Sequence, residues 1–314
     1  MVFTSSNHKR GIFKVFFKAK TNHSVFKKPL IHCMSKKLKY FFRTLKSKKR
    51  EKTFGPHAKG IVYDSKNGYM ALPISDLTIG KNLGFKGHWN FTEIQRLLEQ
   101  TSPDDVIYFI GTHVGTLVVP IAKKVKTVVG FEANENTFWF LKANLCLNKI
   151  TNALVFNKAV GDGAKKVTFY QNTVNTGGSK IKPIKDSILY NYDSPKQVEV
   201  DMVALDPFIK EQSLTKPTGI IMDIEGAEFF ALKGMQDTLS KTRFLYIEFV
   251  PHHLQNVSNT TVDDFLKKIT PHFSKAVFLK DNTNFNISGQ EKQLLEHLKL
   301  LEKNNVADDI LFTN

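Results

Sequence analysis

Cysteine, acidic residues near the N-terminus and long apolar segments are all scarce in this chain. Only two of its 314 residues are cysteine, Cys33 and Cys146, which excludes a disulfide-stapled secreted scaffold and favours a reducing compartment. No stretch reaches the roughly 18 uncharged apolar residues that a membrane span requires. Lys14 and Lys18 interrupt the apolar residues near the N-terminus, so no secretory signal is expected. We therefore expect an intracellular, cytoplasmic protein.

The first 50 residues contain no acidic side chain. They hold 12 Lys and 3 Arg, and the first acidic residue is Glu51. The rest of the chain carries 30 basic and 29 acidic side chains, so the net charge of +16 comes almost entirely from this N-terminal region. The near-neutral remainder argues against an extended nucleic-acid-binding surface on the body of the protein.

Residues 1–53 are predicted to form a basic extension, for which three interpretations remain open. A solvated tail is typical of a run of like charges. A surface helix on anionic lipid is indicated by Phe13, Phe16 and Phe17, which lysines flank. A transit peptide is the third, although such peptides favour Arg over Lys. The extension would bind a membrane surface or a nucleic acid, and no obligate protein partner is inferred.

From residue 104 onward, short apolar runs alternate with amphipathic segments. The runs predict strands at 106–110, 127–131, 153–157, 220–223, 244–249, 276–279 and 309–312. The segments between them predict helices over 117–124, 136–148, 226–241 and 261–269. Strands separated by helices are typical of βαβ units, so we predict an α/β domain over 104–314 with a mostly parallel sheet and helices on both faces.

Two regions do not follow this alternation. Residues 54–103 are predicted as a cap and lead-in helix: 54–88 indicate loops and short strands, and Asn90 with Glu93 indicates a helix N-cap with a capping box. Residues 163–215 form an insert with strand-like segments at 166–170 and 197–203. An insert of this length usually serves or covers a site.

The ends of the first two strands carry a pattern typical of nucleoside binding. Gly111 and Gly115 follow the first strand, where a glycine allows the backbone to approach a ligand closely. Glu132 ends the second strand, 21 residues after Gly111. An ionised carboxylate at this position accepts hydrogen bonds from both ribose hydroxyls. A tight turn for the glycines, and a favourable charge at a helix N-terminus for Glu132, are the alternatives.

Carboxylates also gather at the ends of two later strands. Asp223, Glu225 and Glu228 follow the fourth strand, and such crowding costs free energy unless something uses the charges. Glu248 ends the fifth strand, with the adjacent His252 and His253 just beyond. These side chains could act as a general base or contact a substrate. Because no cysteine lies nearby and the histidines do not have helical i,i+4 spacing, no metal site is expected.

Taken together, these segments resemble the FkbM-type family of S-adenosylmethionine-dependent methyltransferases. The matching pieces occur in the family's order: Ile110–Thr116, Gly130–Asn134, Asn157–Asp162, Gly177–Ser179, Asp223–Glu228, Ala231–Gly234 and Ile247–Phe249. The resemblance implies a class I, Rossmann-like fold, in which a seven-stranded, mostly parallel sheet has one antiparallel strand. It also implies S-adenosyl-L-methionine as cofactor and a hydroxyl of a sugar, glycan or small molecule as methyl acceptor.

The resemblance also implies roles for individual residues. Those assigned to the cofactor are Gly111, His113, Gly115, Thr116, Glu132 for the ribose, Asn134, and Asp162 near the adenine. Those assigned to the substrate are Gly178, Ser179 and Glu225. Those assigned to catalysis are Asp223 as the first candidate for the base that removes the hydroxyl proton, then Glu248 and His252.

The chain departs from the family pattern at two positions. Phe109 stands where the family usually has an Asp that holds the charged end of the methionine moiety, and His113 stands where it usually has Asn. A hydrogen bond to a charged group is worth about 1.5–3 kcal/mol, so weaker cofactor binding is expected unless His113, Asp105 or another group substitutes. A methyltransferase-like binding protein without turnover therefore remains an alternative. A nucleic-acid methyltransferase that uses the basic extension is another.

Overall fold

The structure, a computed structural model, describes residues 28–185 and 187–314; for residues 28–37, 188 and 189 it describes the backbone alone. The strands are β1(Gly60–Ser65), β2(Gly68–Pro73), β3(Val106–Ile110), β4(Thr127–Phe131), β5(Ala153–Phe156), β6(Ala159–Val160), β7(Lys165–Gln171), β8(Lys180–Ile181), β9(Lys196–Val203), β10(Gly219–Met222), β11(Phe244–Phe249), β12(Lys275–Phe278), β13(Asn284–Asn286) and β14(Asp308–Thr313). The helices are α1(Lys28–Phe54), α2(Ile79–Lys86), α3(Phe91–Glu99), α4(Val118–Ala122), α5(Glu135–Leu147), α6(Ile188–Asn191), α7(Leu205–Glu211), α8(Glu228–Lys233), α9(Gln236–Leu239), α10(Pro251–His253), α11(Val262–Leu266) and α12(Ile287–Asn304), with a 3₁₀ turn η1(Thr176–Gly178) and a π-helical turn η2(Leu254–Ser258).

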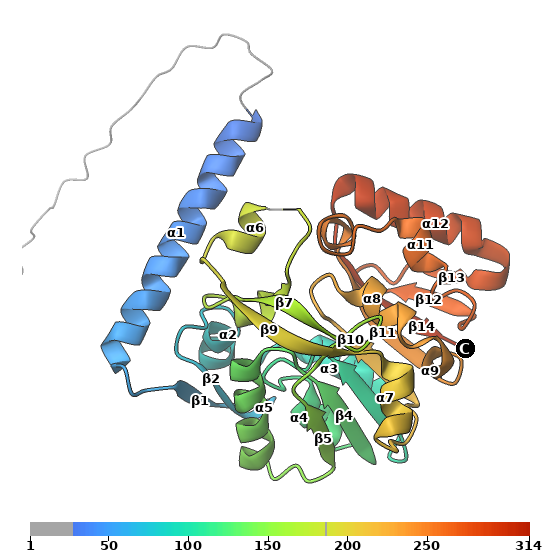
Figure 1. Ribbon diagram of the computed structural model, residues 1–314, viewed down its shortest axis with the longest axis horizontal. Helices are drawn as coiled ribbons and strands as arrows, with labels where there is room; N and C mark the ends of the chain where they lie inside the picture. Colours follow the sequence, from blue (N-terminus) through green and yellow to red (C-terminus); the bar gives the residue numbers. More distant parts are fainter. Residues whose placement is uncertain (1–27, 186) are drawn as a thin grey trace, which may run out of the picture.

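Eight strands form the central sheet, in the order β13-β12-β14-β11-β10-β3-β4-β5 (Figure 1). The five strands from β11 to β5 are parallel, and β14 runs antiparallel to its neighbours β11 and β12. These seven strands confirm the predicted class I fold, and β13 adds a short antiparallel edge strand that was not expected. The strand order reverses between β3 and β10, which opens a crevice at their carboxyl ends.

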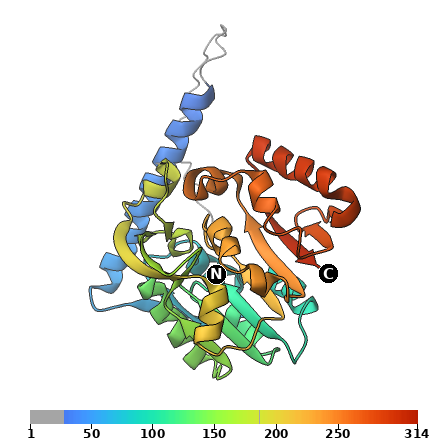
Figure 2. The same cartoon turned by 45° about the vertical axis from the view of Figure 1, so that its right-hand side comes forward.

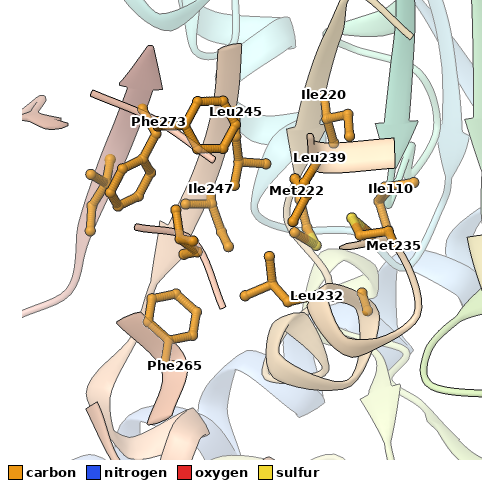
Figure 3. Packing of buried hydrophobic residues seen from close by; sticks show 14 of the residues in the cluster. Ile110, Ile220, Met222, Leu232, Met235, Leu239, Leu245, Ile247, Phe265 and Phe273 are labelled. Atoms are coloured by element: carbon orange, nitrogen blue, oxygen red, sulfur yellow. The ribbon is translucent and has the colours of Figure 1, made fainter. Parts of the chain in front are cut away.

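One face of the sheet packs against α7, α8, α9, α11 and α12. Figure 3 shows Ile110, Met222 and Ile247 on neighbouring strands pointing toward Leu232 and Met235. All five side chains are completely buried, and each such burial contributes roughly 1.5–3 kcal/mol. The continuous apolar runs of the sequence therefore form a sheet that is covered on both faces.

The opposite face packs against α3, α4, α5 and the β1–β2 hairpin. Phe109, Ile221 and Tyr246 lie side by side on this face, in register across β3, β10 and β11. The expected short strands of the 54–88 region are present, but helix α2 was missed. Two glycines lower its intrinsic helix propensity. The Oδ1 atom of Asp76 compensates, because it accepts hydrogen bonds from the backbone N–H groups of residues 78, 79 and 80.

The insert supplies three strands of a second sheet, in the order β6-β9-β7-β8, and β6 precedes the insert in the chain. Both strand-like segments predicted there are confirmed, and they pair with each other antiparallel as β7 and β9. β8 pairs antiparallel with β7. The η1 segment lies between these two strands in the chain and approaches the carboxyl ends of the central strands. The insert thus forms a wall beside the crevice.

Two helix predictions need correction. The helix expected over 226–241 is broken into α8 and α9 because Gly234 lies against the backbone of Gly161, where a Cβ atom would collide with the carbonyl oxygen. Asn90 does not form the expected capping box, since its φ is 47° and its side chain caps no backbone N–H. It donates instead to the Glu93 carboxylate at 2.5 Å.

The basic extension ends in the long helix α1, whose N-terminal part extends past the rest of the molecule (Figures 1 and 2). Its C-terminal half is attached to the body: Ser47 is buried and donates to the carbonyl of Ser75 at 2.8 Å. Phe13, Phe16 and Phe17 lie outside the described residues. No helix in the described part of the chain is long and apolar enough to cross a membrane.

Asn144 is a buried polar link between the hairpin and the body. Its side chain bonds both backbone groups of Ala71 and the carbonyl of Val114. Replacing Asn144 by Ala removes three hydrogen bonds of about 1 kcal/mol each and leaves buried partners unsatisfied, so we expect a loss of roughly 3 kcal/mol in the free energy of unfolding. Urea denaturation measures it. Asn136→Ala, at an exposed position of the same helix, is the matched control and should change stability by less than about 0.5 kcal/mol.

Candidate active site

A cavity of about 320 Å³ lies at the carboxyl ends of β3, β4, β10 and β11. Its walls come from the loops after these strands, from α3, and from the insert around η1. The volume falls in the usual range for small-molecule sites, and the position is the switch point at which open α/β sheets bind ligands.

The loop after β3 closes one side of this cavity. Gly111 has a φ of 91°, and a Cβ atom there would overlap the carbonyl oxygen of Asp223 on the neighbouring loop. Only glycine allows this close approach without strain. His113 also has a left-handed conformation, with a φ of 49°, which turns its backbone N–H toward the Glu132 carboxylate at 2.8 Å.

Glu132 is fixed at the end of β4 by two backbone donors. One carboxylate oxygen accepts from the N–H of His113 and the other from the N–H of Asn134, at 2.8 and 2.9 Å. Each oxygen keeps a second lone pair that can accept a ligand hydroxyl. Burial raises the pKa of Glu132 to about 7, in spite of the two N–H donors, which act in the opposite direction.

Three further carboxylates stand on the floor of the cavity. Asp223 follows β10, Glu248 ends β11, and Glu93 extends from α3 and accepts a hydrogen bond from the Tyr246 hydroxyl at 2.9 Å. Burial and the neighbouring negative charges raise the pKa of Asp223 and of Glu248 well above the ordinary range. Burial, reinforced by Asp309, raises the pKa of Glu93 to about 7.

Glu225, another carboxylate of the cavity, forms an ion pair with Lys180. Lys180 is buried, and its Nζ lies 2.9 Å from the Glu225 carboxylate and 5.0 Å from the ring centre of Tyr190. The Nε2 atom of His253 lies 3.6 Å from the same carboxylate. Burial and the charge of Lys180 lower the pKa of His253 to about 2, so its imidazole is neutral.

The η1 segment is attached to the glycine loop by a chain of polar contacts. The Thr176 hydroxyl lies 2.8 Å from Nε2 of His113 and donates to Asp76 at 3.1 Å. Ser179 accepts from the N–H of Asn172 and donates to the carbonyl of Thr176. Asp76 therefore positions both helix α2 and the wall of the cavity, a role that no local sequence pattern indicates.

The structure brings most of the predicted site residues together. Those that line the cavity are Gly111, His113, Thr116, Glu132, Ser179, Asp223, Glu225 and Glu248. Gly115, Asn134 and Gly178 lie next to lining residues in the chain but do not line the cavity themselves. Gly115 packs under Leu141, and Asn134 caps helix α5.

Two predicted site residues lie elsewhere and are corrections. Asp162 does not line the cavity, because its carboxylate is held by Lys165 at 2.7 Å and Lys233 at 3.2 Å. His252 is also absent from the lining, and its ring stacks on Tyr190. Of the two adjacent histidines, His253 is the one near Glu225, and its side chain is buried.

Phe109 lines the floor of the cavity without filling it. Its side chain is almost completely buried among the apolar residues beneath the site. Glu93 was interpreted from the sequence only as a helix cap, yet it lines the same cavity and approaches the sheet through Tyr246. Glu93 on α3 thus supplies a carboxylate to the cavity, whereas β3 supplies none because Phe109 stands there.

The lining residues are strongly unbalanced in charge. Among the described residues, the lining includes five carboxylates, on Glu93, Glu132, Asp223, Glu225 and Glu248, and one lysine, Lys158. The arrangement therefore favours a ligand that carries positive charge. Carboxylate oxygens of Asp223, Glu228 and Glu248 also lie within 4.8 Å of one another, a spacing that a hard divalent cation could bridge. A metal ion at these three carboxylates would differ from the sequence-based expectation that the protein has no metal site.

The sheet order, the glycine loop after β3 and the carboxylate at the end of β4 together define a class I methyltransferase. The sequence profile of the methyltransferase FkbM domain matches residues 110–268, and the chain belongs to this family.

Individual relatives are distant. The hexuronic acid methyltransferase AglP of Haloferax volcanii is 23% identical over 155 residues, which are 49% of this chain and 60% of that protein. The FkbM methyltransferase structure from Methylobacillus flagellatus has a TM-score of 0.42 and 17% identity, covering 68% of this chain and 44% of that one. M. jannaschii TYW2 in complex with AdoMet has a TM-score of 0.38 and 12% identity, covering 82% and 87%.

The raised pKa of Glu93 predicts a stability that falls with pH. In the unfolded chain this group ionises near 4.5 and in the folded protein near 7, so folding becomes less favourable as pH rises between these values, by at most about 3 kcal/mol. Glu93→Gln should remove this component, and the variant should gain stability over the wild type at pH 8 but not at pH 4.5. Denaturant unfolding across this range measures it. The exposed Glu99→Gln should follow the wild type, and identical curves for all three proteins would contradict the assignment.

Proposed function

We propose that this protein transfers a methyl group from S-adenosylmethionine to a hydroxyl of a sugar. The observation that carries the proposal is the excess of carboxylates around a cavity at the switch point of the sheet. The cofactor has a cationic sulfonium and a cationic amino group, which such a cavity would attract. Family membership and the carboxylate at the end of β4 support the same conclusion.

The residues of the cavity fit the cofactor. Glu132 retains accepting capacity on both oxygens for the two ribose hydroxyls. The loop at Gly111 leaves backbone rather than side chain on the cavity wall. The buried Nδ1 atom of His113, a residue of the cavity lining, has no hydrogen-bond partner among the described residues.

Glu93 is our candidate for the group that replaces the missing acid on β3. It lines the same cavity as Phe109, its carboxylate is fixed by Asn90 and Tyr246, and no lysine or arginine forms an ion pair with it among the described residues. A cationic amino group beside Glu93 would favour its ionised form. With this assignment, α3 supplies the negative charge that β3 lacks at position 109, so the departure at Phe109 does not require an inactive protein.

When bound, the cofactor supplies a methyl group activated by the positive sulfonium. The protein then has to hold the acceptor oxygen in line with that methyl group and to accept the hydroxyl proton. Asp223 and Glu248 line the cavity, and no other described residue forms a hydrogen bond with either carboxylate. Burial and the neighbouring carboxylates raise both pKa values, which makes the ionised form of each group a stronger base. We assign the base to Asp223, with Glu248 next to it.

The acceptor is proposed from the chemistry of the insert wall and from a relative. Asn175, Thr176 and Ser179 place amide and hydroxyl groups along the cavity, which suits a polyhydroxylated ligand. The Haloferax volcanii relative is described as a hexuronic acid methyltransferase. Both observations support a sugar hydroxyl.

Glu132→Gln should weaken S-adenosylmethionine binding roughly tenfold to a hundredfold, because a neutral amide replaces a charged acceptor for the ribose hydroxyls. Isothermal titration calorimetry at pH 8, where Glu132 is ionised, measures the affinity. Glu135→Gln, on an exposed position three residues away, is the matched control and should bind as the wild type does. Equal affinity for both variants would overturn the ribose assignment.

Asp223→Asn should lower methyl transfer roughly a hundredfold or more, since a general base contributes about that much. Transfer of a labelled methyl group to glucuronic-acid oligosaccharides, assayed with and without EDTA, gives the rate. Asp263→Asn, which breaks only an exposed ion pair with Lys267, is the control. An unchanged rate for Asp223→Asn would exclude it as the base. A wild-type rate that EDTA abolishes would assign the three clustered carboxylates to a metal ion.

A further inference from the structure

Helix α1 has an exposed apolar face. Leu38, Phe41, Phe42 and Leu45 are 57, 57, 52 and 46% exposed. Their spacing of i, i+3, i+4 and i+7 places them on one side of the helix, within an arc of about 100°. Four large apolar side chains grouped in this way are far more than the scattered exposed residues of an ordinary protein surface.

The opposite side of the same helix is attached to the body. Tyr40 stacks on Tyr192 with ring centres 4.3 Å apart. Arg43 donates to the Thr78 hydroxyl, and Ser47 to the carbonyl of Ser75. Arg50 donates to the Tyr63 hydroxyl at 2.7 Å. These contacts fix the rotation of α1 about its axis, so the apolar side must point away from the protein.

Basic side chains border this apolar face. Lys39 and Lys46 lie on one side of it and Lys48 on the other, and all three are exposed. Beside the helix, a groove is lined by five cations (Lys39, Arg43, Lys46, Arg50 and Lys81), and none of the described residues in its lining is acidic. Phe85, which is 86% exposed, stands at this groove.

We propose that α1 binds an anionic lipid surface, with Leu38, Phe41, Phe42 and Leu45 inserted among the acyl chains and the groove facing lipid phosphates. An amphipathic helix with aromatic residues on one side and lysines along its borders is suited to the plane of a membrane interface. A nucleic acid would engage the cations but leave the four apolar side chains uncovered. A second copy of the helix would bring two strongly basic segments together.

This surface lies next to the candidate active site. Thr78 lines both the basic groove and the cavity. Asp76, whose carbonyl accepts from Arg50, also accepts from Thr176 on the cavity wall. Binding through α1 would therefore hold the cavity close to the lipid surface. The proposal concerns the helix and does not depend on methyl transfer.

The test is sedimentation of the full chain with vesicles of phosphatidylcholine containing about a quarter phosphatidylglycerol, compared with vesicles of phosphatidylcholine alone. We expect binding that is stronger to the anionic vesicles and weakened by salt. Replacing both Phe41 and Phe42 by Ser should lower the affinity by about tenfold or more. The Lys39→Glu/Lys46→Glu double variant should also lower it. Trp139→Ser, which removes an aromatic side chain of 53% exposure on α5, is the matched control and should bind as the wild type does.

Three results would overturn the proposal. One is a Phe41→Ser/Phe42→Ser variant that still binds the anionic vesicles fully, because residues outside α1 would then carry the binding. The second is an absence of vesicle binding together with RNA binding that only the lysine variant loses. The third is a dimer in light scattering that the phenylalanine variant converts to a monomer, without vesicle binding by either protein. Circular dichroism of each variant verifies that the fold is intact.

Discussion

The crowding of carboxylates at one end of a parallel sheet is the constraint on which the rest of this structure depends. Glu93, Glu132, Asp223 and Glu248 come from four different elements and meet around one cavity, and each has a raised pKa because burial disfavours its charge. Such an arrangement costs folding free energy in the empty protein. It becomes favourable when a cationic ligand enters, so the cost in stability and the capacity to bind have the same physical origin.

The fold produces this crowding through geometry that the core enforces. Parallel strands bring their carboxyl ends to one edge, and the reversal of strand order between β3 and β10 leaves a gap there. Gly111 lets the β3 loop lie against the carbonyl of Asp223, and both Glu132 and the candidate base Asp223 line the cavity beside this loop. The buried row of Phe109, Ile221 and Tyr246 then forms an apolar floor beneath the charges.

The sequence predicted what depends on local pattern. The apolar runs at 106–110, 127–131 and 244–249 match β3, β4 and β11 residue for residue, since a buried parallel strand has no other requirement. Glu132 and Asp223 could be placed because they follow such strands directly. Contacts between distant segments could not be predicted in this way. Glu93 reaches the cavity only through the approach of α3 to β11. Asp162 lies outside it, because the nearby Lys165 and the distant Lys233 hold its carboxylate.

Local pattern also misled where tertiary contacts override propensity. The helix over 226–241 breaks because Gly234 must lie against Gly161, and α2 forms in spite of two glycines because Asp76 caps it. The basic extension could be interpreted as a tail on charge alone. Its last part is an ordered helix because Arg43, Ser47 and Arg50 find partners on the body.

The most direct test of the central claim is the number of protons that leave the protein when S-adenosylmethionine binds. Calorimetric titrations at pH 7 in buffers of different ionisation enthalpy, with EDTA present, give this number. Glu93 and Glu132, each with a pKa of about 7 when empty, are partly protonated at this pH, and a cationic ligand with a ribose diol should release protons from the cavity. Binding without any proton release would contradict the account, because the carboxylates of the cavity would then take no part in holding the ligand.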